Sequence, residues 1–527
     1  MSKKLIKSGL IVSVMTLVSR VLGLARDIVI ADIMGANSSA DVFFFANKIP
    51  NFFRRLFAEG AFAQAFVPVL SEYRAEDEEK GTNETKKLIA QVSGTLGVVI
   101  SLVTLFGMLA SSLFVMLFGF GWFLDWYNGE AGSEKFVLAS TLLKITFPYL
   151  WFISFTALSG AVLNTMGRFA VSAFTPVLLN ICIISAAIYL TPMMENPAFA
   201  LAWGVFLGGL VQFLFQLPFL YRAGFLVKPQ WAWHAKGVKK IRQLIVPALF
   251  GVSVTQINLL LDTLIASFLV TGSISWLYYA DRLLEFPLGL FGIGIATVIL
   301  PALSSLHAKQ NTNEFSQTLD WALRVVCLFG LPAMVGLIVL AQPIIMILFM
   351  RGEFDQTVVL QVSYALYAYL AGLISFMFIK VLAPGYYARQ DTKTPVKIGI
   401  KAMVANMVFN LILAPFFGYV GLAIATAMSA TLNAFWLYQG LKQQNIFTLS
   451  STTWLFLVKM LIAALVMAVG VFYYSPSFDV WLTMSISTQI LQLIITIGLG
   501  LLGYFFCLVV LGIRFNHFKI ISNKVRA

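Results

Sequence analysis

The sequence predicts an all-α integral membrane protein of about fourteen transmembrane helices, and three observations support this fold class. Hydrophobic residues make up 59% of the 527 residues and charged residues 11%, against about 25% charged residues in a soluble domain. Apolar runs long enough to cross a bilayer, roughly 20 residues each, follow one another along the whole chain. Lys and Arg gather in alternate connections between these runs. The composition therefore excludes a soluble globular enzyme.

The helices can be placed in order from the apolar runs and the charged stretches that separate them. The first run follows a basic start that resembles a signal peptide. It continues to Met34 without a small-residue cleavage site, so we expect a retained helix. The second run ends before the charged residues 71–87, and the basic stretch 222–242 separates the sixth run from the seventh. The expected helices cover residues 9–34, 41–70, 88–118, 136–166, 170–192, 198–221, 243–270, 275–306, 315–350, 356–388, 396–416, 419–441, 452–474 and 484–513.

The distribution of basic residues predicts the topology. When alternate connections are assigned to opposite sides, 24 of the 36 Lys and Arg residues fall on one side, and Lys135 and Arg351 fall on the other. The side that is richer in Lys and Arg is the cytoplasmic side. We therefore expect an even number of spans with both termini in the cytoplasm. The net charge of +13 is explained by this topology, and no nucleic-acid partner is expected.

Ten basic residues remain within the predicted helices, where charge is costly and normally faces a water-filled cavity or a partner. Six of them lie in helices 1, 2 and 8, which also hold six carboxylates. Those isolated in helices 4, 9, 10 and 13 are expected to reach the membrane surface or to pair locally. The basic residues are Arg20, Arg26, Lys48, Arg54, Arg55, Lys144, Arg282, Arg324, Lys380 and Lys459, and the carboxylates are Asp27, Asp32, Asp41, Glu59, Asp281 and Glu285.

An internal repeat is predicted, because helices 1 and 2 resemble helices 7 and 8 at an offset of 233 to 235 residues. Asp27 aligns with Asp262, and residues 46–48 align with 280–282. Each copy would hold six helices, an even number, so both copies have the same orientation and should bind a substrate between them near mid-membrane. The predicted organisation is an N-terminal lobe of residues 1–223, a C-terminal lobe of residues 224–442, and two further helices with a cytoplasmic tail in residues 443–527.

The charged helices point to a phosphate-bearing substrate. Arg20 and Arg26 are six residues apart, roughly 600° of helical rotation, so they suit one ligand that is held from two directions. Pro50 is expected to kink helix 2 and to open a pocket beside the next two arginines. Guanidinium groups bind phosphate oxygens in pairs, and Arg282 would add a contact from the second copy. The carboxylates would compensate the arginines in an empty cavity; structural ion pairs between the lobes are the alternative.

Other kinds of chemistry are missing from the predicted membrane region. The three His residues fall in connections or in the tail, which disfavours a metal site or a His-based acid–base site in the membrane. No GxxxxGK[ST] sequence occurs, so no internal ATPase is expected. The three Cys residues lie far apart in apolar runs and are interpreted as core residues. The acidic run 76–79 is interpreted as a solvated loop.

Four segments of the sequence closely resemble the MurJ (MviN) lipid II flippases, which belong to the multidrug/oligosaccharidyl-lipid/polysaccharide exporter superfamily. The resemblance extends along essentially the whole chain and includes the fourteen helices. The segments are SRVLGLARD at 19–27, NFFRRLFAEGAF at 51–62, QAFVP at 64–68 and YYADRLLEFP at 278–287.

The resemblance implies a transporter, not an enzyme, that moves lipid II by alternating access from the cytoplasmic to the outer leaflet of the bacterial inner membrane. Lipid II is the undecaprenyl-diphosphate-linked precursor of peptidoglycan, so the implied roles are cell-wall biogenesis and cell shape. Helices 13 and 14 would hold the polyprenyl tail, with plain anchoring as the alternative. A monomer surrounded by membrane lipids, near the cell-wall synthesis machinery, is implied. The implied substrate-binding residues are Arg20, Arg26, Arg54 and Arg282, and the implied cavity and gating residues are Ser19, Asp27, Asp41, Lys48, Arg55, Glu59, Asp281 and Glu285.

The resemblance also implies one candidate cofactor, Na⁺. The matching positions are Asp262, Asn406, Asn410 and Thr426, with the carbonyl of Leu422. Asn410 stands where the family has a carboxylate, so one carboxylate and two amides remain, which is a weak cage for a hard cation. Hydrogen bonds between helices are the alternative role for these polar groups.

Two alternative functions remain open. One is the export of another lipid-linked oligosaccharide, or of cationic drugs, by a related transporter. A drug exporter is disfavoured because its cavity should be aromatic and acidic, whereas this one is rich in arginine. The other is a membrane enzyme that acts on undecaprenyl diphosphate, such as a phosphatase. The internal repeat and the absence of His from the predicted helices disfavour this enzyme.

Overall fold

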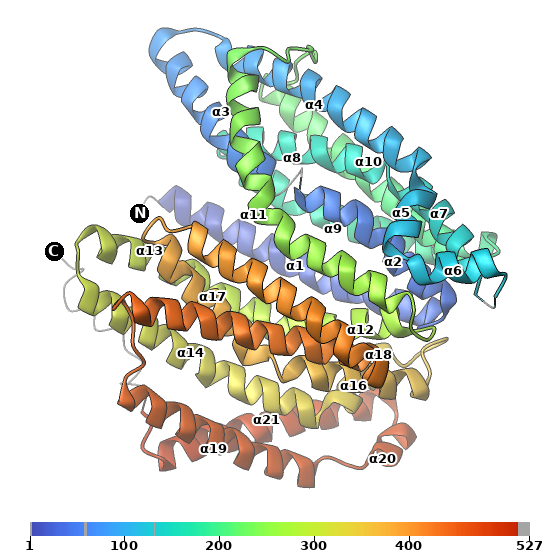
Figure 1. Ribbon diagram of the computed structural model, residues 1–527, viewed down its shortest axis with the longest axis vertical. Helices are drawn as coiled ribbons and strands as arrows, with labels where there is room; N and C mark the ends of the chain where they lie inside the picture. Colours follow the sequence, from blue (N-terminus) through green and yellow to red (C-terminus); the bar gives the residue numbers. More distant parts are fainter. Residues whose placement is uncertain (1–2, 57–60, 131, 515–527) are drawn as a thin grey trace. The chain divides into compact units, whose positions relative to one another are not determined.

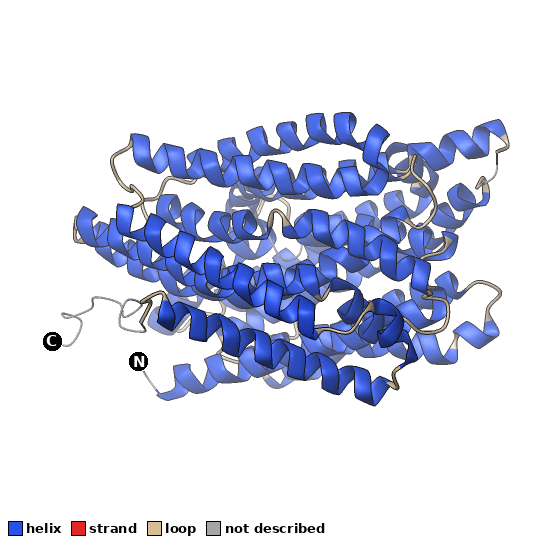
Figure 2. Ribbon diagram, turned by 90° about the horizontal axis from the view of Figure 1, so that it is seen from below, coloured by secondary structure: helices blue, strands red, loops and turns tan. Residues whose placement is uncertain are grey.

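The computed structural model describes residues 3–56, 61–130 and 132–514. Throughout these residues the chain forms helices joined by short connections, and Figure 2 shows no strand among them. The predicted all-α class is therefore confirmed. The chain divides into two compact units: unit 1 holds Met1–Ser275 with Arg351–Phe354, and unit 2 holds Trp276–Met350 with Asp355–Ala527.

Unit 1 contains the helices that precede α12, shown from blue to green in Figure 1. They are α1 (Lys3–Met34), α2 (Ser38–Arg54), α3 (Ala61–Lys80), α4 (Glu84–Leu109), α5 (Ser111–Phe118), α6 (Phe120–Asn128), α7 (Glu134–Thr146), α8 (Tyr149–Thr165), α9 (Phe169–Tyr189), the 3₁₀ turn η2 (Thr191–Met193), α10 (Pro197–Arg222) and α11 (Lys236–Ala266).

Unit 2 contains the remaining helices, and α12 (Ser273–Pro287) crosses the boundary because its first three residues belong to unit 1. The others are the π-helix η3 (Leu288–Ile293), α13 (Gly294–Ala308), α14 (Thr312–Val339), α15 (Ala341–Phe349), α16 (Gln356–Leu370), α17 (Leu373–Tyr387), α18 (Lys393–Gln443), α19 (Ser451–Tyr474), α20 (Phe478–Thr483) and α21 (Ile486–Val510).

The predicted spans all fall on helical segments where the structure describes them. Helix α18 covers two of the predicted spans. They meet at a kink at Gly418 (φ 56°, ψ −136°), a backbone conformation that glycine adopts easily. By length and apolarity, the described residues contain nine spans, or ten when the pair α16 and α17, bent by 41°, is taken as one. That count takes α18 as a single helix, and the number fourteen stays a prediction.

The two predicted repeat copies share an uncommon backbone feature. A π-helical turn at Arg55–Leu56 follows α2, and the π-helix η3 follows α12. Short π segments are rare, and adding the repeat offset to residues 55–56 gives positions inside η3. This match supports a duplication. Pro50 lies inside α2, which continues to Arg54, and the π-helical turn begins at Arg55; the predicted kink at Pro50 stays a prediction.

Apolar packing explains why α11 belongs to unit 1. Val238 and Ile241 at its start are buried in a core formed with α3, α4, α8 and α10, around Phe66 and Leu163. Figure 1 shows α11 running beside α3, and residues of the two helices contact each other. The unit boundary after Ser275 thus differs from the predicted lobe boundary at 223, which concerns the repeat and remains a prediction.

The acidic run 76–79 is helical, so its interpretation as a loop was wrong. Helix α3 continues to Lys80, and Asp77 accepts hydrogen bonds from the Thr82 hydroxyl and from the backbone N–H groups of Glu84 (2.9 Å) and Thr85 (2.8 Å). The carboxylate therefore satisfies free N–H groups in the first turn of α4. Desolvation raises the pKa of Asp77, but these hydrogen bonds outweigh it and lower the pKa to about 2.

Candidate functional site

Arg26 of α1 is held at both ends of its guanidinium group. Its Nε and Nη2 donate to Asp27 Oδ1 at 3.0 and 2.7 Å, and its Nη1 donates to Asn180 Oδ1 of α9 at 3.1 Å. Asn180 in turn donates to the backbone carbonyl of Ser19 at 3.1 Å. The Arg26 side chain is 13% exposed and that of Asp27 is 3% exposed. The expected compensation of an arginine by a neighbouring carboxylate is present here.

Asn180 was not indicated by the sequence, since a lone amide in an apolar run carries no recognisable pattern. Its role depends on the packing of α9 against α1. The two helices are close at Gly23, where an added Cβ would lie 3.8 Å from the Asn180 amide nitrogen. Of the other predicted residues on α1, Arg20 is exposed and Ser19 contributes the carbonyl that Asn180 binds.

The cations of α2 are bound along the helix and to α11. Lys48 donates to Thr263 Oγ1 at 3.1 Å, and Arg55 donates to Gln256 Oε1 at 3.3 Å. Arg54 donates to Asn51 Oδ1 at 3.0 Å on its own helix. These contacts hold the predicted cationic residues in defined positions on two packed helices. The predicted gating residue Glu59 lies outside the described residues.

Asp41, in the first turn of α2, binds the turn that starts α12. Its Oδ2 accepts from the Gly272 N–H at 2.6 Å, and its Oδ1 accepts from the Ser275 N–H at 2.9 Å and the Ser275 hydroxyl at 2.7 Å. Asp41 is 2% exposed and Ser275 is fully buried. The two residues are 234 positions apart and so occupy equivalent positions in the predicted repeat. The carboxylate replaces water for the free N–H groups at a helix start.

The same turn is bound from a second side by residues that the sequence did not indicate. Lys135 donates to Thr271 Oγ1 at 2.7 Å, and its ammonium group lies 5.9 Å from the centre of the Trp122 ring. The Gly121 N–H donates to Ser267 Oγ at 3.0 Å. Lys135 was assigned to a connection by charge counting, but it lies in the first turn of α7 and is 6% exposed. Burial, which only the fold provides, distinguishes it from an ordinary loop lysine.

In unit 2, Arg282 is held by residues of its own helix, α12. Its Nε and Nη2 donate to Tyr278 Oη at 3.2 and 3.1 Å, and its Nη1 donates to Glu285 Oε2 at 3.1 Å. These partners lie four residues before and three residues after it, on the same helix face. The side chain remains 37% exposed, so it can reach a ligand. Asp281, also predicted, is exposed.

The candidate Na⁺ ligands of α18 are bound to one another. Asn410 Nδ2 donates to Asn406 Oδ1 at 3.0 Å, Asn406 Nδ2 donates to Thr426 Oγ1 at 3.4 Å, and Thr426 Oγ1 donates to the Leu422 carbonyl at 2.9 Å. The side-chain oxygens of Asn406 and Thr426 and the Leu422 carbonyl thus already accept hydrogen bonds. These bonds form a polar network within α18, which was the alternative role; Asp262, the one predicted carboxylate ligand, lies on α11, and a Na⁺ site stays a prediction.

Two of the isolated basic residues have local partners in unit 2. Arg324 of α14 pairs with Asp320 and donates from Nε to Thr453 Oγ1 of α19 at 2.6 Å. Lys459 of α19 donates to the Leu511 carbonyl, just after α21, at 2.7 Å. Local pairing was expected for these two residues. Arg324 joins α14 to α19, and Lys459 joins α19 to the end of α21. Lys144 and Lys380 are exposed.

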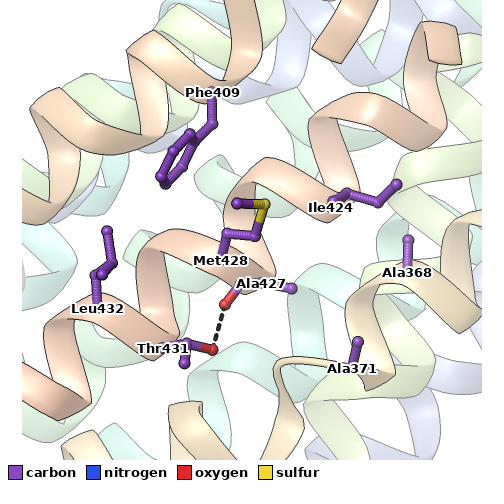
Figure 3. Close-up of a pocket in the computed structure, with 8 residues that line it drawn as sticks. All are labelled: Ala368, Ala371, Phe409, Ile424, Ala427, Met428, Thr431 and Leu432. Atoms are coloured by element: carbon purple, nitrogen blue, oxygen red, sulfur yellow. Dashed lines mark hydrogen bonds between the residues drawn. The ribbon is translucent and has the colours of Figure 1, made fainter. Parts of the chain in front are cut away.

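An apolar pocket of about 330 Å³ lies between the end of α16 and α18. Figure 3 shows Phe409 and Met428 pointing into it, and the Thr431 hydroxyl turned to the Ala427 carbonyl of its own helix. None of its lining residues is a predicted site residue, and the lining offers no charge for a phosphate. The charged clusters, rather than this pocket, are the candidate site.

Comparison with known proteins identifies the family. The family model described as lipid II flippase MurJ matches residues 30–492. The chain belongs to the MurJ family of lipid II flippases. A probable lipid II flippase MurJ of Vibrio cholerae is 61% identical over 98% of both chains. The lipid II flippase MurJ of Burkholderia cenocepacia is 40% identical over 98% of this chain and 99% of its own. As a MurJ family member with many apolar helices, the chain is a multi-pass inner-membrane protein.

Solved structures agree with the family assignment. A lipid II flippase MurJ in an inward closed conformation has a TM-score of 0.78 and 28% identity, covering 95% of this chain and 98% of that chain. An inward-facing multidrug resistance MATE transporter has a TM-score of 0.67 at 16% identity, covering 81% of this chain and 94% of that chain. The second likeness concerns the fold alone, and the relation of this MurJ family member to the exporter superfamily stays a prediction.

Proposed function

We propose that this chain moves lipid II from the cytoplasmic to the outer leaflet by alternating access, with arginines binding the diphosphate. The observation that carries the proposal is membership of the MurJ family along nearly the whole chain. The restrained guanidinium groups of Arg26 and Arg282 support it, because each is held by a carboxylate that an anionic ligand can replace. The alternatives are export of another lipid-linked oligosaccharide and enzymatic cleavage of undecaprenyl diphosphate.

The proposed chemistry is an exchange of anionic partners. An arginine buried without a partner is costly, so Asp27 and Asn180 stabilise Arg26 while no substrate is present. Diphosphate oxygens match the guanidinium fork in pairs and would replace both acceptors. Arg20 and Arg54, which the family resemblance places in the same set, would complete the binding. Asp41 would control gating through the turn that it binds.

The proposed arrangement in the membrane follows from the basic residues. Both termini would lie in the cytoplasm, since 24 of the 36 Lys and Arg residues fall on that side. Helices α19 and α21 would accept the polyprenyl tail. The transporter would act as a monomer near the cell-wall synthesis machinery. No step is assigned to Na⁺, because the amides of α18 bind one another.

The test uses Arg26→Ala with Lys309→Ala as the matched control, since Lys309 is an exposed basic residue outside the cluster. Each variant replaces the wild-type protein in cells, and lipid II on the outer leaflet is measured after rapid depletion of the wild type. Arg26→Ala should reach the membrane in normal amounts and abolish outer-leaflet lipid II, whereas Lys309→Ala should not. Normal translocation of lipid II by Arg26→Ala would refute the proposed role of Arg26 in binding the diphosphate. Phosphate release by the purified protein would favour the enzyme instead.

A further inference from the structure

The segment that joins α10 to α11, residues 223–235, is fixed to the side of α4. The Gln230 N–H donates to the Ala90 carbonyl at 2.8 Å, and the Ala232 N–H donates to Thr95 Oγ1 at 3.2 Å. Gly94 lies between these contacts, and a Cβ at this position would overlap the backbone of Gln230. The connecting segment therefore has a defined position on α4 although it forms no regular structure.

Its contacts place the connecting segment at the depth of the membrane interface. Helix α4 has 26 residues and is about 39 Å long at 1.5 Å per residue, some 9 Å more than the roughly 30 Å hydrocarbon core. Ala90 and Thr95 lie about 9 and 16 Å from the start of α4 on the same scale. With α4 perpendicular to the membrane and its excess length on this side, Ala90 lies at the boundary between the lipid head groups and the acyl chains, and the segment reaches this boundary.

The aromatic residues of the segment are arranged as an interface anchor. The rings of Trp231 and Trp233 are stacked, with centroids 5.8 Å apart and planes inclined by 11°. The guanidinium carbon of Arg242, in the first turns of α11, lies 3.9 Å from the centre of the Trp233 ring. Trp231 is 57% exposed, so the stack ends in an open indole. Exposed tryptophans at this depth are typical of membrane–water interfaces.

Basic side chains surround this stack. Lys228, Lys236 and Lys239 are exposed, and the buried Nε of Arg242 has no hydrogen-bond acceptor among the described residues. Three carboxylates, Glu72, Glu76 and Glu84, lie near Tyr73, which packs against Gly237. Glu72 and Glu84 are paired with other lysines, Lys240 and Lys87, so Glu76 remains against the four basic groups of the patch. A guanidinium stacked on an indole can still donate from its edge, and phosphate oxygens are the acceptors that match it. The patch therefore has a surplus of positive charge.

We propose that the connecting segment 223–235 and the start of α11 bind the phosphate of an anionic phospholipid in the cytoplasmic leaflet. Arg242 and Lys239 contact the phosphate, and the indole of Trp231 lies against the upper acyl chain. A lipid is preferred to a soluble anion because an exposed indole at the depth of the interface meets acyl chains. The assignment to the cytoplasmic leaflet depends on the proposed orientation of the protein; the site itself does not. The site is also separate from the arginines that are assigned to lipid II.

The experiment measures which lipid contacts Trp231. The full chain is reconstituted in nanodiscs of phosphatidylcholine with a minor fraction of brominated phosphatidylglycerol or, separately, brominated phosphatidylcholine. The sequence holds 11 Trp residues, so the Trp231 signal is the difference between the wild type and Trp231→Phe. Brominated phosphatidylglycerol should quench this signal several-fold more than brominated phosphatidylcholine at equal mole fraction. Each basic residue removed should lower the preference roughly fivefold.

Matched variants separate the phosphate site from simple insertion of the indole. Arg242→Gln and Lys239→Gln should remove the preference while both lipids still quench Trp231, and Lys309→Gln should leave it unchanged. Equal quenching by the two lipids in the wild type, or no quenching by either, would overturn the proposal. Loss of the preference on adding inorganic phosphate would assign the patch to a soluble anion and refute the lipid site. No lipid II is present, so none of these outcomes bears on flipping.

Discussion

Substituting Asp41 with alanine should open the turn between α11 and α12, which faces the outside in the proposed orientation. Asp41 accepts three hydrogen bonds, from the N–H groups of Gly272 and Ser275 and from the Ser275 hydroxyl, at 2.6, 2.9 and 2.7 Å. We expect these bonds to exist when the outer side is closed and to break when it opens. Their removal would then shift the equilibrium toward the open state.

The size of the shift follows from the number of bonds lost. A hydrogen bond to a charged group contributes about 1.5 to 3 kcal/mol, and 1.4 kcal/mol corresponds to about a tenfold change in an equilibrium constant. Ser275→Ala removes one of the three bonds, so the open fraction should rise about tenfold or more. Asp41→Ala removes all three and should shift the equilibrium at least tenfold further. The double variant should resemble Asp41→Ala, because the bond lost in Ser275→Ala is already absent there.

The assay is the labelling rate of a reporter cysteine, Ile274→Cys, by a membrane-impermeant thiol reagent. Ile274 is 1% exposed, so its labelling requires opening of the turn. The native cysteines Cys182, Cys327 and Cys507 are first replaced by alanine. If opening is faster than labelling, the rate is proportional to the open fraction. The amount of folded protein in the membrane serves as the control.

An unchanged labelling rate in Asp41→Ala, with normal amounts of folded protein, would refute the reasoning. It would mean that the three hydrogen bonds persist in the open state, so that Asp41 only stabilises the start of α12. A rise in Asp41→Ala without any rise in Ser275→Ala would assign the effect to the backbone N–H groups alone.

Four further predictions concern other residues. Lys135→Met should raise labelling of the Ile274→Cys reporter about tenfold, less than Asp41→Ala, because it removes one hydrogen bond from a charged group to the same turn; a rate equal to the parent would contradict this. Arg324→Ala should lower the free energy of unfolding by about 3 kcal/mol, since it leaves the mostly buried carboxylate of Asp320 without its cation, as thermal unfolding would measure. Desolvation raises the pKa of Asp77, but hydrogen bonds outweigh it and lower the pKa to about 2. The ionised carboxylate should therefore stabilise α4 fully above about pH 4 and lose this effect as the pH falls through about 2. Below that pH, amide exchange in the first turn of α4 should accelerate about fivefold. Replacing Na⁺ by K⁺ should leave lipid II flux unchanged, and a Na⁺-dependent flux would contradict the interpretation of the α18 amides.

The predicted helices and the structure agree well because hydrophobicity alone places a membrane span. The disagreements lie where local backbone geometry decides. Helix α2 continues through Pro50 to Arg54, and a π-helical turn that no sequence pattern indicated begins at Arg55. The acidic run 76–79 belongs to α3, which continues to Lys80, and Asp77 within it binds the first turn of α4, a contact that the run of charges did not indicate.

Pairing in the candidate site was predictable where the partners are neighbours in sequence. Arg26 with Asp27, and Arg282 with Glu285, follow from adjacency and helical spacing. Asn180 and Lys135 were missed, because their significance comes from helices far away in the sequence. A neutral amide and a single loop-like lysine carry no signal until packing buries them.

The sequence by itself indicated the membrane class and the family, which are confirmed, and it predicted the repeat and the cytoplasmic side of the connections, which stay predictions. These properties depend on composition and on short motifs, which are local and are read directly along the chain. Only the tertiary structure decided which polar groups meet: Asp41 with Ser275, Arg26 with Asn180, and the connecting segment 223–235 with α4. The physical reason is that a buried polar group must find a partner, and folding brings that partner from a distant part of the chain.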